Sequence, residues 1–476
     1  MASAEEQFEA LRQAVPLTSR DDYFATMLAQ SSPLGLGDKV RYDHSTDLWH
    51  IWNDIIWKPD RVDGVHELVR DRLYAWLGSK VINPTDDSAK TYATLLNTSK
   101  KKSVLEALRT MPGIAMSGEE WDTQPTLMGF NNGVLDLETL VLDKSPDPAL
   151  HISRSTGFDW DPEADASLFT AFIEDITSHD PDVAVYVLRL LGYSMIGTNR
   201  EQKFWMWVGR GSNGKGLLAR TVEKALGNYA YSPPDTLYMA NKMGSSRSDA
   251  ARPELLKLQG ARFTFMSEPQ GQKFNEEMLK AHSGNDPIEA RTLYSARYKS
   301  FTPTHKIVFL TNEMPKTDDV GPSMQRRVRV VKFLEDYGPE SGRADNTLED
   351  RLQTPEALQA ALYVMAVQAY HYLKTSSLPE PHQVTLWSRA YITENDPISS
   401  FTEVMCVEDP KAEVKSGVLY KAFDAFCEQN GYESMSLNAF GRAVSARYPR
   451  RLRNSGSFYT GIRLKNMTDG AADDDG

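Results

Sequence analysis

Residues 205–221 read WMWVGRGSNGKGLLART, and this stretch indicates the fold class. An apolar run at residues 204–208 precedes a glycine-rich loop, and a helical pattern follows it. A buried strand, a glycine loop and a helix in this order are typical of a phosphate-binding loop, because backbone N–H groups and the start of the helix together hold an anion. The spacing from Gly209 to Gly214 and Lys215 fits that motif.

The residue after the lysine departs from the usual motif. It is Gly216, where a Ser or Thr hydroxyl would hold Mg²⁺. Lys215 would still reach the β- and γ-phosphates of ATP, whereas the alternative is a chance turn of Gly and Lys residues. The residues predicted to bind nucleotide are Gly209, Gly211, Ser212, Asn213, Gly214, Lys215 and Gly216.

Further apolar runs predict buried strands at residues 262–266, 307–310 and 328–333. Helical patterns separate them, so we expect an α/β sheet with the glycine loop at the carboxyl end of a strand. Polar residues follow two of these strands: Ser267 with Glu268, and then Asn312.

A carboxylate such as Glu268 could polarise an attacking water or hold Mg²⁺ through water. The amide of Asn312 could bond to the γ-phosphate or to that water. The alternatives are an ordinary polar strand end and an asparagine that starts a loop.

Arg326 and Arg327 stand just before the last predicted strand. They are either a basic strand start or an arginine finger offered to the γ-phosphate of a neighbouring subunit. The second interpretation requires a ring built from head-to-tail interfaces.

The composition restricts the function classes. The 476 residues carry a net charge of −12, which argues against nucleic-acid binding over the whole surface. Two cysteines cannot form a four-cysteine zinc site. The N-terminus does not resemble a signal peptide, and the longest apolar stretch, residues 183–197, is too short to span a bilayer. We expect a soluble cytoplasmic protein, in the host cytoplasm if it is viral, without a membrane partner.

Residues 434–468 contain no acidic residue and carry a local charge of +7. Two predicted helices, at residues 417–430 and 436–448, precede a β-pair around Asn454-Ser455-Gly456. This order resembles a winged helix, whose basic residues would meet duplex phosphates. The alternative is a basic protein-docking module. The predicted DNA contacts of this segment are Arg442, Arg447, Arg450, Arg451 and Arg453.

The motifs in the order GRGSNGKG, RFTFMSEP, TNEMP and RRVRVVKF resemble superfamily 3 helicases. More closely, they resemble the phage, plasmid and poxvirus primase–helicase family, in which Asn213, a lone Glu after the second strand and a TN-x-x-P motif are typical. The upstream stretches FNNGVLDLETLVL and VYVLRLLGYSMIGTNREQKF are similar to the region before the motor. The resemblance covers roughly residues 20–340.

This resemblance implies an AAA+-like P-loop ATPase that forms a homo-hexameric ring and moves 3′-to-5′ on DNA with ATP and Mg²⁺. Lys215 would be the phosphate lysine, Glu268 the catalytic acid and Asn312 the sensor. Arg326 or Arg327 would be the finger, and Arg327 is slightly favoured. Gly216 and Ser267 depart from the family pattern. The resemblance therefore implies that phosphates, water, Ser267 and Glu268 would be the ligands of Mg²⁺.

The stretch 280–306 matches the family motif that forms a hairpin projecting into the ring channel. Cations for phosphates and aromatics for bases suit single-stranded DNA, whereas the alternative is a surface hairpin with core aromatics. The predicted contacts in this stretch are Arg291, Tyr294, Arg297, Lys299 and Lys306.

The whole chain is therefore expected to have an AAA+-like core, a mainly helical N-terminal region and a winged-helix-like C-terminal domain. The expected segments are residues 1–112 (helical), 113–200 (collar), 201–345 (ATPase core), 346–400 (helical connector), 401–468 (winged helix) and 469–476 (acidic tail). Residues 1–112 are too few for a primase domain, so a separate primase or polymerase is an expected partner beside single-stranded and forked DNA. The rivals are a replication initiator that does not unwind DNA and a P-loop kinase or NTPase unrelated to DNA.

Overall fold

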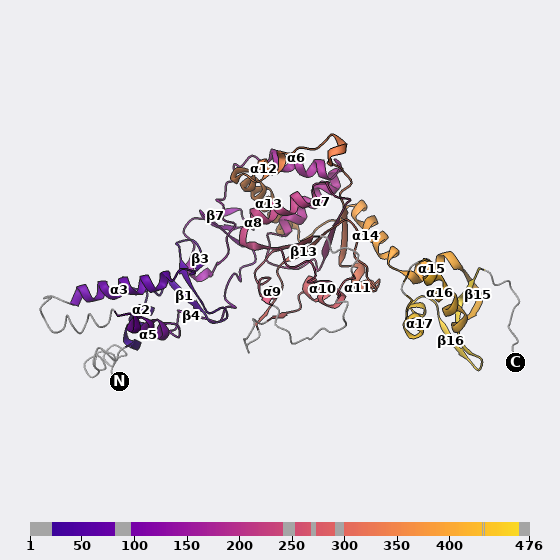
Figure 1. The fold of residues 1–476 in the computed structure, drawn as a ribbon, viewed down its shortest axis with the longest axis horizontal. Helices are drawn as coiled ribbons and strands as arrows, with labels where there is room; N and C mark the ends of the chain where they lie inside the picture. The colour runs from indigo at the N-terminus through magenta and orange to yellow at the C-terminus, as the bar shows by residue number, and fades with distance from the viewer. Residues whose placement is uncertain are drawn as a thin grey trace.

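A computed structural model of the chain shows a mixed α/β protein with three parts along its long axis (Figure 1). An N-terminal unit lies at one end, a central body contains the largest sheet, and a C-terminal unit lies at the other end. The structure describes residues 21–80, 97–240, 253–267, 273–290, 299–430, 432 and 434–465, with the side chains of 77–80 left aside.

The central sheet has five parallel strands in the order β14-β8-β13-β10-β9. The strands are β8 (Phe204–Val208), β9 (Ala230–Tyr231), β10 (Phe263–Ser267), β13 (Lys306–Thr311) and β14 (Val328–Lys332). The four strands predicted from apolar runs are all present, which confirms the predicted α/β sheet. The short strand β9 was not predicted, because two residues carry no readable pattern.

Alternate residues of β8 enter two different hydrophobic cores. Phe204 and Met206 belong to one core, whereas Trp205 and Trp207 belong to the other. This alternation follows from the two-residue period of a strand and explains the continuous apolar run, because parallel sheets are covered on both faces.

Helices cover both faces of this sheet. The helices of the Trp205 core are α6 (Ser167–Ile176), α7 (Pro181–Tyr193), α8 (Lys215–Leu226) and α13 (Pro355–Thr375), with α12 (Leu348–Leu352) at its margin. The elements on the other face are α9 (Pro253–Leu256), α10 (Glu276–Ser283), α11 (Pro322–Gln325), α14 (His382–Glu394) and the antiparallel pair β11 (Ile288–Ala290) and β12 (Lys299–Phe301).

The core around Trp205 is continuous from Met128 to Val384. It includes residues of a small antiparallel sheet and of α6 and α7, which precede the glycine loop, as well as α13, which follows the last strand. The segments on either side of residues 200 and 345 therefore share one interior. The small sheet has the order β5-β6-β7, with β5 (Leu127–Phe130), β6 (Gly133–Asp136) and β7 (Val141–Asp143).

In the described residues, the N-terminal unit combines helices with a small sheet. Its helices are α2 (Asp21–Ala29), α3 (Gly64–Lys80) and α5 (Thr98–Leu108), and its strands are β1 (Val40–Asp43), β2 (Leu48–Trp52), β3 (Trp57–Pro59) and β4 (Ala115–Met116). The turn at Asn53 joins β2 to β3, and the Asn53 side-chain oxygen accepts a hydrogen bond from the Ile56 N–H at 2.8 Å.

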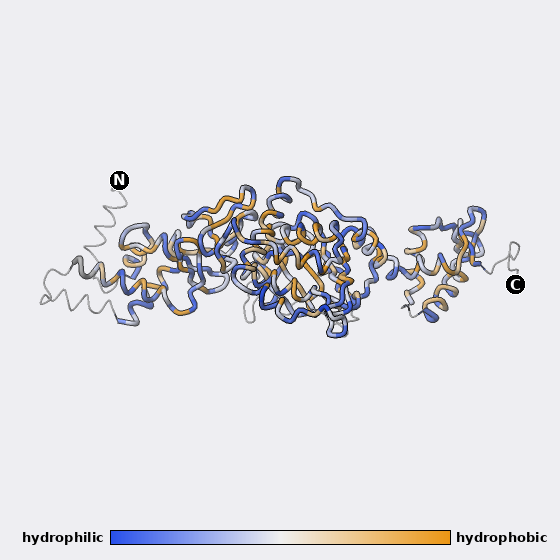
Figure 2. The backbone as a smooth tube through the Cα atoms, turned by 90° about the horizontal axis from the view of Figure 1, so that it is seen from above, coloured by the Kyte–Doolittle hydropathy of each residue, from blue (hydrophilic) through white to orange (hydrophobic). Residues whose placement is uncertain are grey.

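The C-terminal unit has its own core around Phe401, Phe423 and Phe440. Its elements are α15 (Pro397–Met405), β15 (Cys406–Lys415), α16 (Ser416–Asn430), α17 (Leu437–Ser445), β16 (Arg450–Arg453) and β17 (Gly456–Leu464). The predicted helix–helix–β-pair order is present, and the polar strand β15 completes a sheet of order β15-β17-β16. Figure 2 shows apolar residues concentrated inside the body and a narrow neck between α14 and this unit.

Within the described part of the chain, no helix has the length and apolar character needed to cross a membrane.

Candidate nucleotide-binding site

The glycine loop (residues 209–214) connects the carboxyl end of β8 to α8, which begins at Lys215. Strand β8 lies between β13 and β14, so the loop opens at a point where the strand order reverses, as ligand sites in parallel sheets do. Two glycines are required there. A Cβ on Gly209 would lie 1.8 Å from Asn213 Nδ2, and Gly214 has a φ of +83° with the Ile176 side chain 2.3 Å from its Cβ position.

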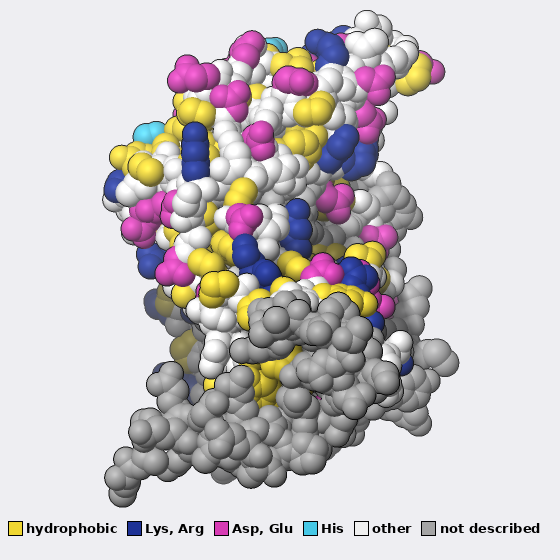
Figure 3. Space-filling model, turned by 90° about the vertical axis from the view of Figure 1, so that its left-hand side faces the viewer, with side chains coloured by type: hydrophobic (Ala, Val, Ile, Leu, Met, Phe, Trp, Pro, Cys, Tyr) yellow, Lys and Arg dark blue, Asp and Glu magenta, His cyan; other side chains and the backbone are white. Residues whose placement is uncertain are grey.

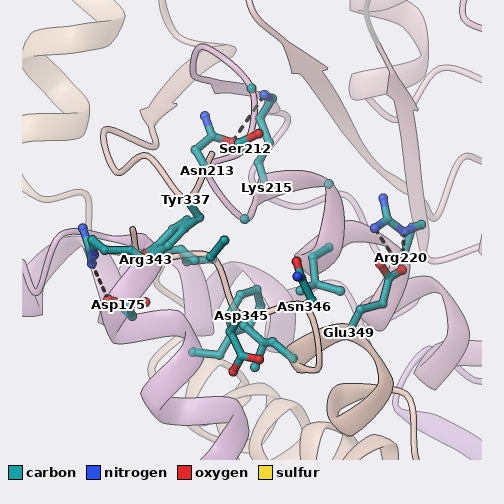
Figure 4. Close-up of a pocket in the computed structure, with 18 of the residues that line it drawn as sticks. Asp175, Ser212, Asn213, Lys215, Arg220, Tyr337, Arg343, Asp345, Asn346 and Glu349 are labelled. Atoms are coloured by element: carbon teal, nitrogen blue, oxygen red, sulfur yellow. Dashed lines mark hydrogen bonds and ion pairs between the residues drawn. The ribbon is translucent and has the colours of Figure 1, made fainter. Parts of the chain in front are cut away.

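The Lys215 ammonium points back at the glycine loop (Figure 4). It donates to the Gly209 carbonyl at 2.9 Å and to Asn312 Oδ1 at 3.0 Å, and it lies 3.4 Å from Asn213 Oδ1. The structure therefore brings together Lys215 and Asn312, two of the predicted catalytic residues. All three acceptors are neutral oxygens, which an anionic phosphate would outcompete for the ammonium.

Ser267 ends β10 at the same edge of the sheet, since it pairs in register with Leu310 of β13. Its N–H donates to Asp235 Oδ1 at 3.1 Å, and its side chain is exposed beside the loop. Glu268 lies outside the described residues. The described part of the chain holds no group of three or more His, Cys, Asp or Glu side chains arranged for a metal ion. Ser267 alone is not a magnesium site, so a metal would depend on the nucleotide phosphates for most of its ligands.

A pocket of about 850 Å³ extends from the glycine loop, within the size range of small-molecule sites. Part of its lining is apolar and comes from Leu168, Ala171 and Phe172 of α6. Basic and acidic side chains from residues 343–351 also line it. A pocket that combines a candidate phosphate cradle with an apolar wall suits a nucleotide.

The segment after β14 is fastened to the loop. The Tyr337 N–H donates to the Ser212 carbonyl at 2.7 Å. The Arg343 guanidinium lies 4.8 Å from the Tyr337 ring centroid and bonds Asp175 of α6 at 3.0 Å (Figure 4). Burial raises the pKa of the Tyr337 hydroxyl, which therefore stays protonated as a donor. Sequence reasoning missed these three residues, because no motif connects them to the glycine loop.

Arg326 and Arg327 lie at the other edge of the sheet from the glycine loop. They precede Val328, and a five-residue strand is roughly 15 Å long, so neither arginine lines the pocket of its own chain. Arg327 is only 8% exposed, and its Nη1 donates to the Ser323 carbonyl at 3.0 Å and hydroxyl at 2.8 Å. Arg326 is exposed. Of the two arginines, Arg326 is therefore the one accessible to another molecule, although the sequence slightly favours Arg327.

The predicted hairpin corresponds to the antiparallel pair β11–β12, whose connecting residues 291–298 are outside the described part. Three predicted DNA contacts fall there: Arg291, Tyr294 and Arg297. The place of the hairpin in a ring channel stays a prediction. Lys299 begins β12 and donates to Ser45 Oγ of the N-terminal unit at 2.6 Å. Burial lowers the pKa of Lys299, while the nearby Asp43 charge opposes this shift.

The structure contradicts the prediction that Lys306 contacts DNA. Its side chain is fully buried, its ammonium donates to the carbonyls of Ile196 and Thr304, and it lies 4.4 Å from the centroid of the Tyr193 ring. Burial, aided by the charge of Arg262, lowers its pKa well below the usual value. The lysine was read as a surface cation because nothing in the sequence reveals these partners.

The C-terminal cations differ in their surroundings. Arg442 and Arg450 are exposed, and no described carboxylate pairs with either of them. Arg453 forms an ion pair with Glu413 of β15 at 2.7 Å, and Arg451 lies 3.7 Å from the same carboxylate. The Arg447 guanidinium, just after α17, bonds Asp396, the N-cap of α15, and so is engaged within the unit.

The opposite end of the molecule has no single dominant charge on its described surface. Figure 3 shows this face, where Lys and Arg side chains are interspersed with Asp and Glu side chains. This distribution agrees with the overall net charge of −12 and with local rather than general contacts to nucleic acid.

Comparisons with known proteins relate both ends of the chain to the D5 proteins. Residues 22–178 match the family model described as "D5 N terminal like", and residues 393–455 match the one described as "Poxvirus D5 protein-like". The resemblance to poxvirus proteins inferred from the motifs is confirmed at this level. The assignment to superfamily 3 stays a prediction.

Several viral proteins are similar to the chain. "Putative helicase L207/L206" of Acanthamoeba polyphaga mimivirus is 34% identical over 223 residues, 45% of this chain and 22% of that protein. "Putative helicase 022R" of Frog virus 3 is 28% identical, over 54% of this chain and 28% of that protein. "Putative primase C962R" of African swine fever virus (strain Badajoz 1971 Vero-adapted) is 24% identical, over 68% and 35%. The chain thus covers about a third or less of each relative.

Among solved structures, the apo A form of the NrS-1 C-terminal region has a TM-score of 0.48 at 10% identity, over 88% of this chain and 95% of that one.

Proposed function

We propose that the chain is an ATP-driven, ring-forming helicase that moves 3′-to-5′ on DNA during replication of a virus or another mobile element. The observation that carries the proposal is the convergence of Lys215, Asn312 and the glycine loop at one edge of a parallel sheet, beside a nucleotide-sized pocket. The names of the viral relatives support a replication function of the helicase or primase type.

The pocket suggests a role for each residue in ATP hydrolysis. Backbone N–H groups of the glycine loop and the Lys215 ammonium would bind the triphosphate, and the apolar wall of α6 would hold the base. Once Lys215 turns to the phosphates, the Asn312 amide is released to orient the attacking water or the γ-phosphate. Glu268, directly after Ser267, would accept the proton of that water.

A magnesium ion bound with the nucleotide would supply charge neutralisation on the phosphates. Ser267 and Glu268 are the candidate protein ligands.

The position of Arg326 supports a ring. An exposed arginine at the edge opposite its own pocket can reach a γ-phosphate only in a neighbouring subunit, and head-to-tail contacts of this kind close into rings. A homo-hexamer is the ring size that the family resemblance implies. The β11–β12 hairpin would then project its connecting residues, 291–298, toward a single DNA strand.

The C-terminal unit is proposed to bind duplex DNA at the fork. Between residues 397 and 465 the chain has ten Lys or Arg against seven Asp or Glu residues. Helix α17 and the hairpin β16–β17 would contact phosphates as a winged helix does, and Arg442 and Arg450 are the least engaged candidates. A separate primase or polymerase would complete the replication machinery.

The test compares ATP hydrolysis with and without single-stranded DNA, followed by unwinding of a forked duplex. We expect DNA-stimulated hydrolysis and strand separation, both abolished in Lys215→Ala. An ATP hydrolysis rate that does not change when DNA is added would favour a kinase or small-molecule NTPase. Binding of ATP and DNA without strand separation would favour a replication initiator, and either result would overturn the helicase assignment.

A further inference from the structure

The glycine that replaces the usual hydroxyl residue lies beside an arginine. A Cβ placed on Gly216 would lie 3.3 Å from Arg220 Nη1, and the described structure has no other atom within 4 Å of that position apart from its own helix backbone and chain neighbours. The two residues are four positions apart on α8 and therefore share one face of the helix. Both line the same pocket as Lys215.

One side of the Arg220 guanidinium is held by a carboxylate. Its Nε and Nη2 donate to the same oxygen of Glu349, at 3.1 and 3.0 Å, and this pairing is visible in Figure 4. Nη1 takes no part in these two bonds and is the atom nearest to the empty side of Gly216. About half of each of the two side chains is exposed, at 52% and 53%, so the pair is solvated and worth little as an ion pair.

We propose that Arg220 binds the phosphate chain of the nucleotide in the space that a side chain at position 216 would otherwise occupy. The inference rests on the proposed nucleotide site. A guanidinium presents several N–H donors in a planar fork and binds phosphate more strongly than a solvated carboxylate pair holds together. Nucleotide binding would therefore transfer Arg220 from Glu349 to the phosphates.

The glycine at position 216 is compatible with this assignment. A Ser or Thr there would place its Cβ 3.3 Å from Arg220 Nη1, so the guanidinium would have to shift by a few tenths of an ångström. In this proposal, a cation from α8 stands beside the position where the usual motif has a hydroxyl that orients a metal. Part of the charge neutralisation that Mg²⁺ otherwise gives to the phosphates comes from the chain itself.

A purely structural ion pair makes a different prediction. If Arg220 and Glu349 only fasten α12 to α8, removing either partner has the same effect. If Arg220 binds phosphate, Arg220→Ala weakens nucleotide binding, whereas Glu349→Ala releases the arginine and leaves binding equal or tighter. The two variants therefore separate the two roles.

The experiment titrates a fluorescent ATP analogue into the full chain, with Mg²⁺ and with EDTA. We expect Arg220→Ala to weaken binding about 10-fold or more, the usual range for one charge-assisted hydrogen bond. We expect Arg220→Lys to fall between Arg220→Ala and the unaltered chain. The matched control is Lys224→Ala, one turn further along α8, whose ammonium bonds the Gln353 carbonyl at 3.1 Å outside the pocket.

Equal affinities of Arg220→Ala and the unaltered chain, or equal losses in Arg220→Ala and Glu349→Ala, would overturn the inference while leaving the nucleotide site intact. Absence of binding to the unaltered chain would instead overturn the proposed function. Thermal unfolding of each variant shows whether it is folded, and Arg220→Lys serves if the alanine variant is not.

Discussion

The Nζ atom of Lys215 lies 3.0 Å from the Oδ1 atom of Asn312, although 97 positions separate the two residues in the chain. The contact follows from the sheet, because Val208 at the end of β8 pairs with Thr311 at the end of β13. In the proposed mechanism the two side chains would change partners together, because Lys215 can turn to a phosphate only by leaving Asn312.

Replacing Asn312 by Ala should separate nucleotide binding from hydrolysis. We expect hydrolysis to fall about 100-fold, the usual loss for one polar group that acts in the transition state, while affinity for a nucleotide analogue changes little. Asn430→Ala, in the C-terminal unit, is the control for an ordinary asparagine loss. Equal decreases in affinity and in rate would mean that Asn312 only positions Lys215.

Arg326 and Arg327 should behave differently when replaced by Ala. We expect Arg326→Ala to fold normally and to lose hydrolysis, because its partner is the γ-phosphate of the neighbour. Arg327→Ala should lower the free energy of unfolding by about 1–3 kcal/mol, because the Ser323 carbonyl and hydroxyl oxygens lose the donor that Arg327 provides.

Mixing inactive chains tests the same assignment directly. Arg326→Ala and Lys215→Ala chains, inactive alone, should recover part of the hydrolysis when mixed, because some interfaces then combine an intact lysine with an intact arginine. No recovery in rings that contain both chains would contradict the role of Arg326.

Lys306→Met should change stability with pH and leave DNA binding unaltered. Burial lowers the pKa of Lys306, so the unfolded chain binds more protons than the folded chain between the two pKa values. Stability of the natural chain therefore rises as pH increases through that window. We expect the free energy of unfolding of the natural chain to rise relative to that of Lys306→Met as pH is raised from 7 to 9. A difference that stays constant would show that Lys306 titrates normally.

Replacing both Arg442 and Arg450 by Ala should weaken binding of duplex DNA. Because each phosphate contact contributes roughly one unit to the slope of log affinity against log salt, we expect the slope to fall by about 2. Arg389→Ala, an exposed arginine on α14, is the control. An unchanged slope would favour protein docking as the role of this unit.

The strands and the glycine loop could be predicted because the necessary information is local. The run Phe204–Val208 is apolar throughout and is followed at once by glycines, which is typical of a short strand covered on both faces. The loop residues likewise follow one another in the chain. Once the strands are predicted to be parallel, the proximity of Lys215 and Asn312 can be predicted as well, because parallel strands end at a common edge of the sheet.

Contacts between distant segments could not be predicted in the same way. Arg220 and Glu349 are 129 positions apart and belong to no motif. The burial of Lys306 depends on the Ile196 carbonyl, which reaches it only through the packing of α7 on the sheet. From sequence alone, a charged residue at the start of a strand is predicted to be exposed, because the buried acceptors that it bonds are not known.

The bond between Lys299 and Ser45 has a mechanical consequence. It fastens the base of the β11–β12 hairpin to the N-terminal unit, and Asp43, which also accepts from Ser45, reinforces the attachment. If the hairpin moves as proposed, it must break this bond, bend between its base and its tip, or carry the N-terminal unit with it. In the last case, the N-terminal unit would be part of the load on the proposed motor.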